Sequence, residues 1–141
     1  MTNTSSKFST RRGFTILALS VSVLLAGLVA GTASAGEIVK ANSDAYKQAA
    51  MANKPIIMHV HAAWCPVCAK QNPILEALMK EPEFKDVIVF KIDYDADKAL
   101  VDMLEVKTQS TLIAAKGPVE AGRIAGITDK EKLREFIRKS L

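Results

Sequence analysis

The chain has 141 residues, which suits one domain and is too short for two ordinary ones, and its composition of 49% hydrophobic and 24% charged residues is typical of a globular protein. The formal net charge is +4, but three of the 19 Lys and Arg residues and none of the 15 Asp and Glu residues lie within residues 1–35. The rest of the chain is therefore almost neutral, and the charge gives no indication of a nucleic-acid partner.

Residues 1–35 have the three parts of a secretory signal peptide. Lys7, Arg11 and Arg12 supply a basic start, and an uncharged apolar run follows over residues 14–30. The small residues of segment 33–35, Ala-Ser-Ala, form a cleavage site. We therefore expect removal of residues 1–35 and a mature domain over residues 36–141, exported to the periplasm.

The basic start of this segment also resembles a twin-arginine export signal, whose core is Ser/Thr-Arg-Arg-x-Phe. Segment 10–14 reads Thr-Arg-Arg-Gly-Phe, although Thr15 and Ile16 replace the Leu and Lys that often follow. An ordinary secretory signal is the first alternative. An uncleaved anchor is the second, because residues 13–36 carry no charge and are long enough to span a bilayer. In that case the domain would be membrane-anchored.

The hydrophobic periodicity after residue 36 predicts eight elements, in the order helix, strand, helix, strand, helix, strand, strand, helix. Their ranges, in the same order, are 43–53, 56–61, 66–80, 87–92, 96–104, 111–115, 119–125 and 128–141. The first strand–helix–strand unit predicts parallel strands, and the late hairpin predicts an antiparallel edge. We therefore expect an α/β domain with a central mixed sheet of about four strands flanked by helices.

The chain contains two cysteines, Cys65 and Cys68, which are separated by two residues. A disulfide between them would stabilise the fold little, because the stabilisation grows with loop length and this loop is very short. Residues 36–141 are also numerous enough to bury a core without a covalent link. The pair is therefore interpreted as a redox-active centre.

The position of this pair at the start of a predicted helix suits thiol chemistry. Free backbone N–H groups and the helix dipole favour an anion there, so we expect a lowered pKa for the Cys65 thiol. Pro66 fits the first helical position. Cys68 follows one turn later, so Cys65 would attack a substrate disulfide and Cys68 would resolve the mixed disulfide. Trp64 would shield the pair and offer an apolar surface to a partner.

A metal site is the main alternative, because His59, His61, Cys65 and Cys68 offer two imidazoles and two thiolates. These ligands suit Cu(I) or Zn(II), so a metal-binding module or metallochaperone stays open as a second function. Haem attachment is excluded, since Ala69 stands where a histidine would be required. The leading hypothesis, disulfide exchange, requires no cofactor.

With these motifs in place, residues 36–141 are identified as similar to the thioredoxin family. The matching features are the Trp-Cys-x-x-Cys motif after an apolar strand and six further residues, namely Pro73, Lys91, the pair Thr111-Leu112, Gly117 and Gly126. The resemblance implies a thioredoxin fold and disulfide exchange with protein thiols and disulfides. It further implies that Lys91 tunes the site and that the substrate-binding residues are Trp64, Pro66, Gln109, Ser110 and Thr111.

Three residues depart from the pattern of thioredoxins. Ser110 occupies the position of the family's cis-proline, and a cis bond before serine would cost about 3 kcal/mol, which favours a trans loop of different shape. His59 occupies the position of a buried Asp that moves a proton, and with a pKa near 6.5 it could take that role. His61 replaces an aromatic residue. Ordinary core or rim histidines remain the alternative for both.

The function expected from these features is that of a periplasmic thiol:disulfide oxidoreductase, a monomer acting on protein partners. A small domain without an inserted helical domain resembles the reducing branch of the family, supplied with electrons by a membrane partner. Pro66 directly after the first cysteine instead resembles more oxidising members. We expect a reductant rather than an oxidant. Charged residues such as Asp95 are interpreted as solvated helix faces without a function.

Overall fold

The computed structural model describes residues 35–141. The predicted signal peptide, including its twin-arginine motif, therefore lies outside the described residues apart from Ala35. Among the described residues, no helix combines the length and the apolar character needed to cross a membrane.

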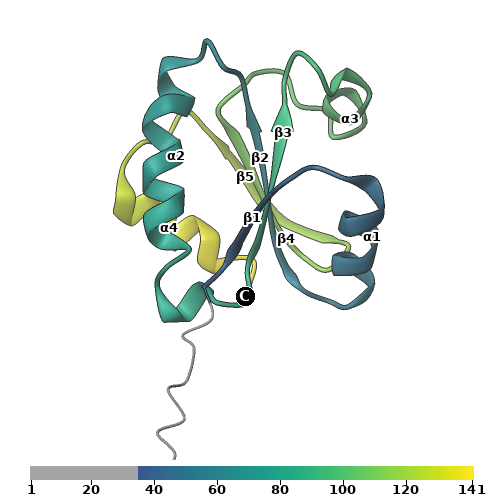
Figure 1. Cartoon of the computed structure of the whole chain (residues 1–141), viewed down its shortest axis with the longest axis vertical. Helices are drawn as coiled ribbons and strands as arrows, with labels where there is room; N and C mark the ends of the chain where they lie inside the picture. The colour runs from purple at the N-terminus through teal and green to yellow at the C-terminus, as the bar shows by residue number, and fades with distance from the viewer. Residues whose placement is uncertain (1–34) are drawn as a thin grey trace, which may run out of the picture. The chain divides into compact units, whose positions relative to one another are not determined.

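A five-stranded mixed sheet forms the centre of the domain, in the order β1-β3-β2-β4-β5 (Figure 1). The strands are β1 (Glu37–Lys40), β2 (Pro55–His61), β3 (Ile88–Asp93), β4 (Thr111–Lys116) and β5 (Val119–Ala125). Strands β1 and β2 both pair with β3 in parallel, whereas β4 runs antiparallel to both β2 and β5. The predicted mixed α/β sheet is confirmed.

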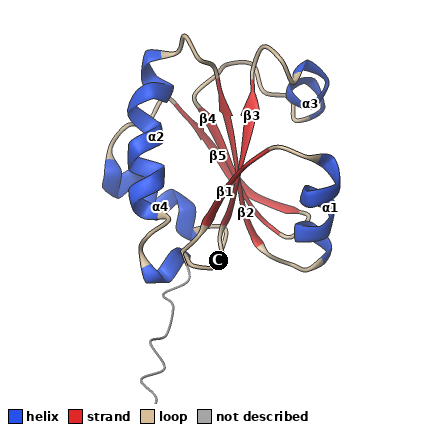
Figure 2. Cartoon of the chain, viewed as in Figure 1, coloured by secondary structure: helices blue, strands red, loops and turns tan. Residues whose placement is uncertain are grey.

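Within residues 35–141, three α-helices and one short 3-10 helix lie between strands, and a fourth α-helix follows the last strand. They are α1 (Ser43–Met51), α2 (Pro66–Leu78), the 3-10 helix η1 (Pro82–Phe84), α3 (Lys98–Met103) and α4 (Lys130–Arg138). Helices α2 and α4 lie on one side of the sheet and α1 and α3 on the other (Figure 2). The domain is thus a three-layer sandwich, and the eight predicted elements are all present.

The strand that the sequence did not predict is β1, whose four residues read Glu-Ile-Val-Lys. The segment is too short for a clear alternation of apolar and polar residues. It becomes a strand because β3 offers a free edge, along which Glu37 pairs with Ile88 and Lys40 with Lys91. The fold class is as expected, with five strands instead of about four.

The central strand β2 is buried on both faces and therefore contributes to two cores. Ile57 packs with Leu75 and Phe136 beneath α2 and α4, whereas Met58 packs with Phe90 on the side of α1 and α3. Because side chains alternate along a strand, His59 must lie on the same face as Ile57, beneath α2. The position of the histidine thus follows from the register of the strand.

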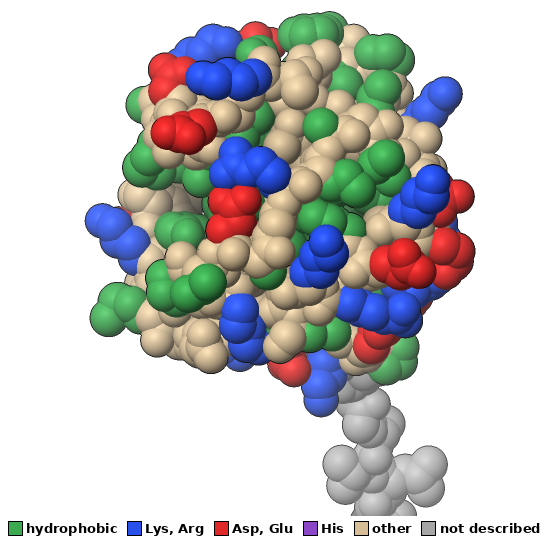
Figure 3. All heavy atoms as spheres, turned by 180° about the vertical axis from the view of Figure 1, so that it is seen from behind, with side chains coloured by type: hydrophobic (Ala, Val, Ile, Leu, Met, Phe, Trp, Pro, Cys, Tyr) green, Lys and Arg blue, Asp and Glu red, His purple; other side chains and the backbone are tan. Residues whose placement is uncertain are grey.

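Helix α4 is joined to the segment after α2 by ion pairs. The Glu81 carboxylate accepts hydrogen bonds from Arg134 at 2.8 and 2.9 Å and lies 3.3 Å from Lys130 Nζ. Arg138 likewise forms a bidentate ion pair with Glu83. Elsewhere on the domain, Lys and Arg side chains are interspersed with Asp and Glu, as Figure 3 shows for one face.

We expect Glu81→Gln to lower the free energy of unfolding by about 1 kcal/mol near neutral pH, because it removes a partly buried ion pair. Hydrogen bonds from Arg134 lower the pKa of Glu81 from 4.5 to about 2. A depressed carboxyl pKa stabilises the fold above the unfolded value and loses that effect as the pH falls from 4.5 towards 2. Urea unfolding of both proteins across this range should show the difference shrinking. A constant difference, or an equal effect of Glu76→Gln on the exposed face of α2, would contradict this.

Candidate active site

The two cysteines lie just after β2, at the N-terminal end of α2. Cys65 is the N-cap residue of α2, and its sulfur accepts a hydrogen bond from the Cys68 backbone N–H at 3.1 Å. Pro66 occupies the first turn of α2, where a backbone N–H would have no hydrogen-bond partner within the helix, so the missing N–H of proline costs nothing. The Cα atoms of the cysteines lie 5.3 Å apart and their sulfurs form a disulfide. The predicted pairing of Cys65 with Cys68 is therefore present in this structure.

This placement favours a thiolate on Cys65 once the disulfide is reduced. A sulfur at an N-cap faces backbone N–H groups and the positive end of the helix dipole. Both stabilise an anion, and a thiolate is the reactive form in disulfide exchange. Cys65 is only 2% exposed and Cys68 only 1%, so a partner must approach through the residues around them.

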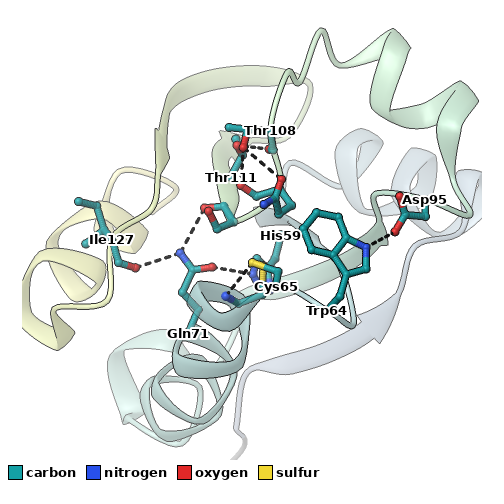
Figure 4. The surroundings of a disulfide bond; sticks show 11 residues. His59, Trp64, Cys65, Gln71, Asp95, Thr108, Thr111 and Ile127 are labelled. Atoms are coloured by element: carbon teal, nitrogen blue, oxygen red, sulfur yellow. Dashed lines mark hydrogen bonds between the residues drawn. A yellow bond between two sulfur atoms is a disulfide. The ribbon is translucent and has the colours of Figure 1, made fainter.

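Trp64 stands beside the pair and is 61% exposed, the most accessible large apolar side chain at the site. Its indole Nε1–H donates a hydrogen bond of 2.7 Å to Asp95 Oδ2 (Figure 4). Asp95 is exposed as expected, but it lies in the turn after β3 rather than on a helix, and it also binds Trp64. The two residues are far apart in sequence and meet because the ends of β2 and β3 are adjacent, so no local pattern could have revealed the bond.

The segment before β4 borders the site and carries Ser110 in the place expected for the family's proline. The described residues contain no cis peptide bond, so the expected trans loop is confirmed. Ser110 is buried and has a φ of +60°, in the left-handed region that costs a non-glycine residue free energy. Its carbonyl oxygen accepts hydrogen bonds from Gly126 N–H at 3.1 Å and from Gln71 Nε2 at 3.2 Å. These bonds hold the unfavourable conformation.

The two residues beside Ser110 belong to the same turn. Thr111 Oγ1 donates to the Thr108 carbonyl at 2.7 Å, and Thr108 Oγ1 lies within hydrogen-bond distance of the Gln109 carbonyl and side chain. Gln109 is half-buried, whereas Thr111 is buried. Gln109, Ser110 and Thr111 thus form one hydrogen-bonded turn, and their role in substrate binding stays a prediction.

His59 lies fully buried beneath α2. Burial lowers its pKa from 6.5 to about 4, despite a hydrogen bond from Nε2 to Gln71 Oε1 of 3.1 Å, which raises the pKa. The expectation that this histidine titrates near neutrality is therefore wrong, because an imidazolium would lose its hydration in the core. The imidazole is neutral at neutral pH and remains able to accept a proton transiently.

Lys91 and His61 lie next to His59. Lys91 is the register partner of His59 across the parallel pair β2–β3, and the strand alternation places it on the same face. The rings of His59 and His61 have centroids 5.7 Å apart. Partial burial and the charge of Lys91 lower the pKa of His61, against the opposing effect of Asp93. A tuning role for Lys91 is still a prediction, and its charge opposes protonation of both histidines.

The metal alternative finds no support in this geometry. Within residues 35–141, no three His, Cys, Asp or Glu side chains come together as a group that could hold a metal ion. The cysteine sulfurs are bonded to each other, and His59 Nε2 is engaged with Gln71. His59, His61, Cys65 and Cys68 are neighbours in the fold without forming a ligand set.

Gln71 is the site residue that the sequence interpretation missed. It lies on α2 with no exposed surface, and its side chain binds His59, Ser110 and Ile127. A signal was present, because residue 71 has helical spacing to the buried residues Leu75 and Leu78. A polar side chain at such a core position must find buried partners.

We expect the oxidised protein to lose stability as the pH falls from 6.5 towards 4. The pKa of His59 is lower in the folded state than in the unfolded state, so between these two values the unfolded state binds a proton at His59 and the folded state does not. The loss should amount to about 3 kcal/mol when the window has been crossed. Urea unfolding should show this slope in the wild type and in Glu81→Gln. His59→Leu should be less stable throughout and should lose most of this slope, with a smaller remainder from His61, whose pKa is also lowered. An undiminished slope in that variant would contradict the assignment.

Comparison with known proteins agrees with this geometry. The family model of thioredoxin matches residues 37–139. Thioredoxin of Chlamydia muridarum is 33% identical over 60% of this chain and 80% of its own length. Mitochondrial thioredoxin of Mus musculus is 31% identical over 60% of this chain, and the match spans about half, 51%, of its length.

Among solved structures, the crystal structure of Trxlp from Edwardsiella tarda EIB202 superposes with a TM-score of 0.69 and 34% identity. The superposition covers 72% of this chain and 97% of the Trxlp chain. The family model matches most of the chain, and the fold and the Cys-x-x-Cys pair at the start of α2 agree with it, so the chain belongs to the thioredoxin family.

Proposed function

We propose that this protein is a thiol:disulfide oxidoreductase that exchanges disulfides with protein partners. The observation that carries the proposal is the Cys65 sulfur at the N-cap of α2, bonded to Cys68 one turn later. This arrangement stabilises a thiolate at the attacking position and keeps a second sulfur within bonding distance. Membership of the thioredoxin family supports the same chemistry.

In the reducing direction, the Cys65 thiolate attacks one sulfur of a substrate disulfide. A bond forms between Cys65 and that sulfur, the substrate disulfide breaks, and the other substrate sulfur leaves as a thiolate. Cys68 then gives up its proton and attacks the Cys65 sulfur, which closes the Cys65–Cys68 disulfide and releases the second substrate thiolate. Two electrons pass to the substrate, and an external dithiol returns the protein to its reduced form.

The surface around the pair supports docking of a protein partner. Trp64 is exposed, held in place by Asp95, and the turn that contains Gln109 and Ser110 borders the cysteines. Pro66 is exposed at the start of α2 on the same side. A partner that contacts these residues would bring its disulfide to Cys65 and would exclude water from the two sulfurs.

The cellular part of the proposal is that the protein works in the periplasm after export, as a monomeric reductant supplied by a membrane dithiol donor. The basic and apolar segments of residues 1–35 and the Ala-Ser-Ala site support export. An uncleaved segment would keep the same domain anchored at the membrane.

Replacing Cys65 with Ser should abolish reduction of insulin disulfides by the pre-reduced protein, because the attacking sulfur is lost. Cys68→Ser should instead trap a mixed disulfide with the substrate, since Cys65 attacks but nothing resolves the product. Non-reducing electrophoresis and mass spectrometry distinguish the two outcomes. Ser140→Ala, a substitution of a buried residue that follows the C-terminal end of α4, is the control with wild-type activity. Undiminished reduction by Cys65→Ser would overturn the proposal.

The direction of exchange can be read from the equilibrium potential of the pair in glutathione or dithiothreitol buffers. A reductant should have a potential below roughly −220 mV, nearer the value of about −270 mV typical of thioredoxin. A value above roughly −180 mV, as in disulfide isomerases and oxidases, would contradict the reducing direction while leaving the exchange activity intact.

A further inference from the structure

The side-chain amide of Gln71 connects three parts of the site (Figure 4). Its Nε2 donates hydrogen bonds to the carbonyl oxygens of Ser110, at 3.2 Å, and Ile127, at 2.9 Å. Its Oε1 lies 3.1 Å from His59 Nε2. Gln71 therefore joins the helix that carries the cysteines to the turn before β4, to the segment after β5 and to the histidine of β2.

Two of these partners determine which way the amide points. Carbonyl oxygens accept hydrogen bonds and donate none, so they require the NH₂ group of Gln71 to face them. The reversed amide would place Oε1 against two carbonyl oxygens, so Oε1 and the Ile127 carbonyl would lose their donor and the Ser110 carbonyl would keep only the bond from Gly126 N–H. The orientation of Gln71 is thus set by the backbone, independently of the histidine.

The amide orientation in turn determines the tautomer of His59. Both hydrogens of Gln71 Nε2 are used by Ser110 and Ile127, and Oε1 can only accept. His59 Nε2 must therefore carry the proton and donate it to Gln71, which leaves Nδ1 as the basic nitrogen. Within the described residues, Nδ1 is buried and has no hydrogen-bond partner.

An unpaired basic nitrogen in a core costs free energy, so its presence here requires an explanation. Gln71 follows Cys68 by three residues, one turn along α2, and it binds His59, so the histidine lies beneath the turn of α2 that follows Cys68. The other charged or titratable groups on this face, Lys91 on β3 and His61 on β2, do not bind Nδ1. His59 Nδ1 is therefore available to the Cys68 thiol, which must lose its proton inside the domain when it attacks Cys65.

We propose that Gln71 is a positioning residue for disulfide exchange, which holds His59 in the Nε2–H tautomer so that Nδ1 accepts the proton of the Cys68 thiol. The inference rests on the proposed function for its catalytic consequence. The side-chain hydrogen bonds of Gln71 go to His59, Ser110 and Ile127. Gln71 acts through His59, and through the same amide it holds the Ser110 carbonyl at the site.

The proton step balances in the reducing direction. While Cys65 is joined to the substrate, the Cys68 S–H proton passes to His59 Nδ1, directly or through one water, as the sulfur attacks Cys65. The Cys65–Cys68 bond forms, the mixed disulfide breaks, and the substrate sulfur leaves with the electron pair. The imidazolium then returns its proton to the released thiolate or to solvent, and Gln71 Oε1 accepts from Nε2–H throughout.

The tautomer can be measured directly in the oxidised wild-type protein. Two-bond ¹H–¹⁵N correlation spectra of His59 near neutral pH should show protonated Nε2 and unprotonated Nδ1. Gln71→Met, which keeps the volume but removes the amide, should give a mixture of tautomers. Leu75→Met, one turn later on α2 and equally buried, is the matched control and should keep the wild-type spectrum. A wild-type spectrum with protonated Nδ1 would overturn the proposal.

The catalytic consequence is tested by separating the two steps of exchange. Quenched-flow analysis of the reduced protein with a model disulfide should show attack by Cys65 changed by less than about twofold in Gln71→Met, as in Leu75→Met. Resolution of the mixed disulfide should slow about tenfold in Gln71→Met alone, because the proton acceptor is no longer held in position. Resolution at the wild-type rate would overturn the positioning role.

If Gln71→Met does not fold, a second variant can be used to test the same role. Gln71→Asn keeps the amide but is one methylene shorter and cannot reach all three partners, so it should slow resolution in the same direction. If neither variant folds, the wild-type tautomer alone decides whether the amide orients His59. A wild-type protein without exchange activity would instead overturn the proposed function, and the tautomer measurement would still decide the structural claim.

Discussion

The site depends on the position of β2 in the middle of the sheet. Both faces of this strand are buried, and its alternation brings His59 beneath α2, where its side chain is fully buried. A buried imidazole must be neutral and must find a partner, which explains both the lowered pKa and the contact with Gln71. The same strand ends at the loop that delivers Cys65 to the N-cap of α2. One strand therefore sets the electrostatics of both the proton site and the sulfur site.

The turn before β4 shows how this chain holds its backbone at the position of the family's proline without that residue. Ser110 adopts a left-handed conformation with trans peptide bonds, and it is stabilised by hydrogen bonds to its carbonyl rather than by a ring. One of these bonds comes from Gln71. The departures from the thioredoxin pattern at His59 and Ser110 are thus connected, since one side chain satisfies both. They form a single polar arrangement beneath the disulfide.

The polar arrangement also has a cost that shapes the behaviour of the protein. Each buried donor or acceptor must be satisfied, and the unpaired Nδ1 of His59 is an exception. Away from the site the domain relies on ordinary apolar packing on both sheet faces and on ion pairs that attach α4. Acid therefore destabilises the domain in two ranges: through His59 as the pH falls from 6.5 towards 4, and through the Glu81 ion pairs as it falls from 4.5 towards 2.

The sequence by itself determined the order of the elements, the mixed sheet, the redox pair and the departures at His59 and Ser110, because periodicity and motif spacing are local properties. It missed β1, whose four residues form a strand only beside the edge of β3. It also missed Gln71 and the bond from Trp64 to Asp95, and it assigned His59 an ordinary pKa. Tertiary structure decided these features, because burial, hydrogen-bond partners and tautomers depend on residues that are distant in sequence and meet only when the sheet and α2 assemble.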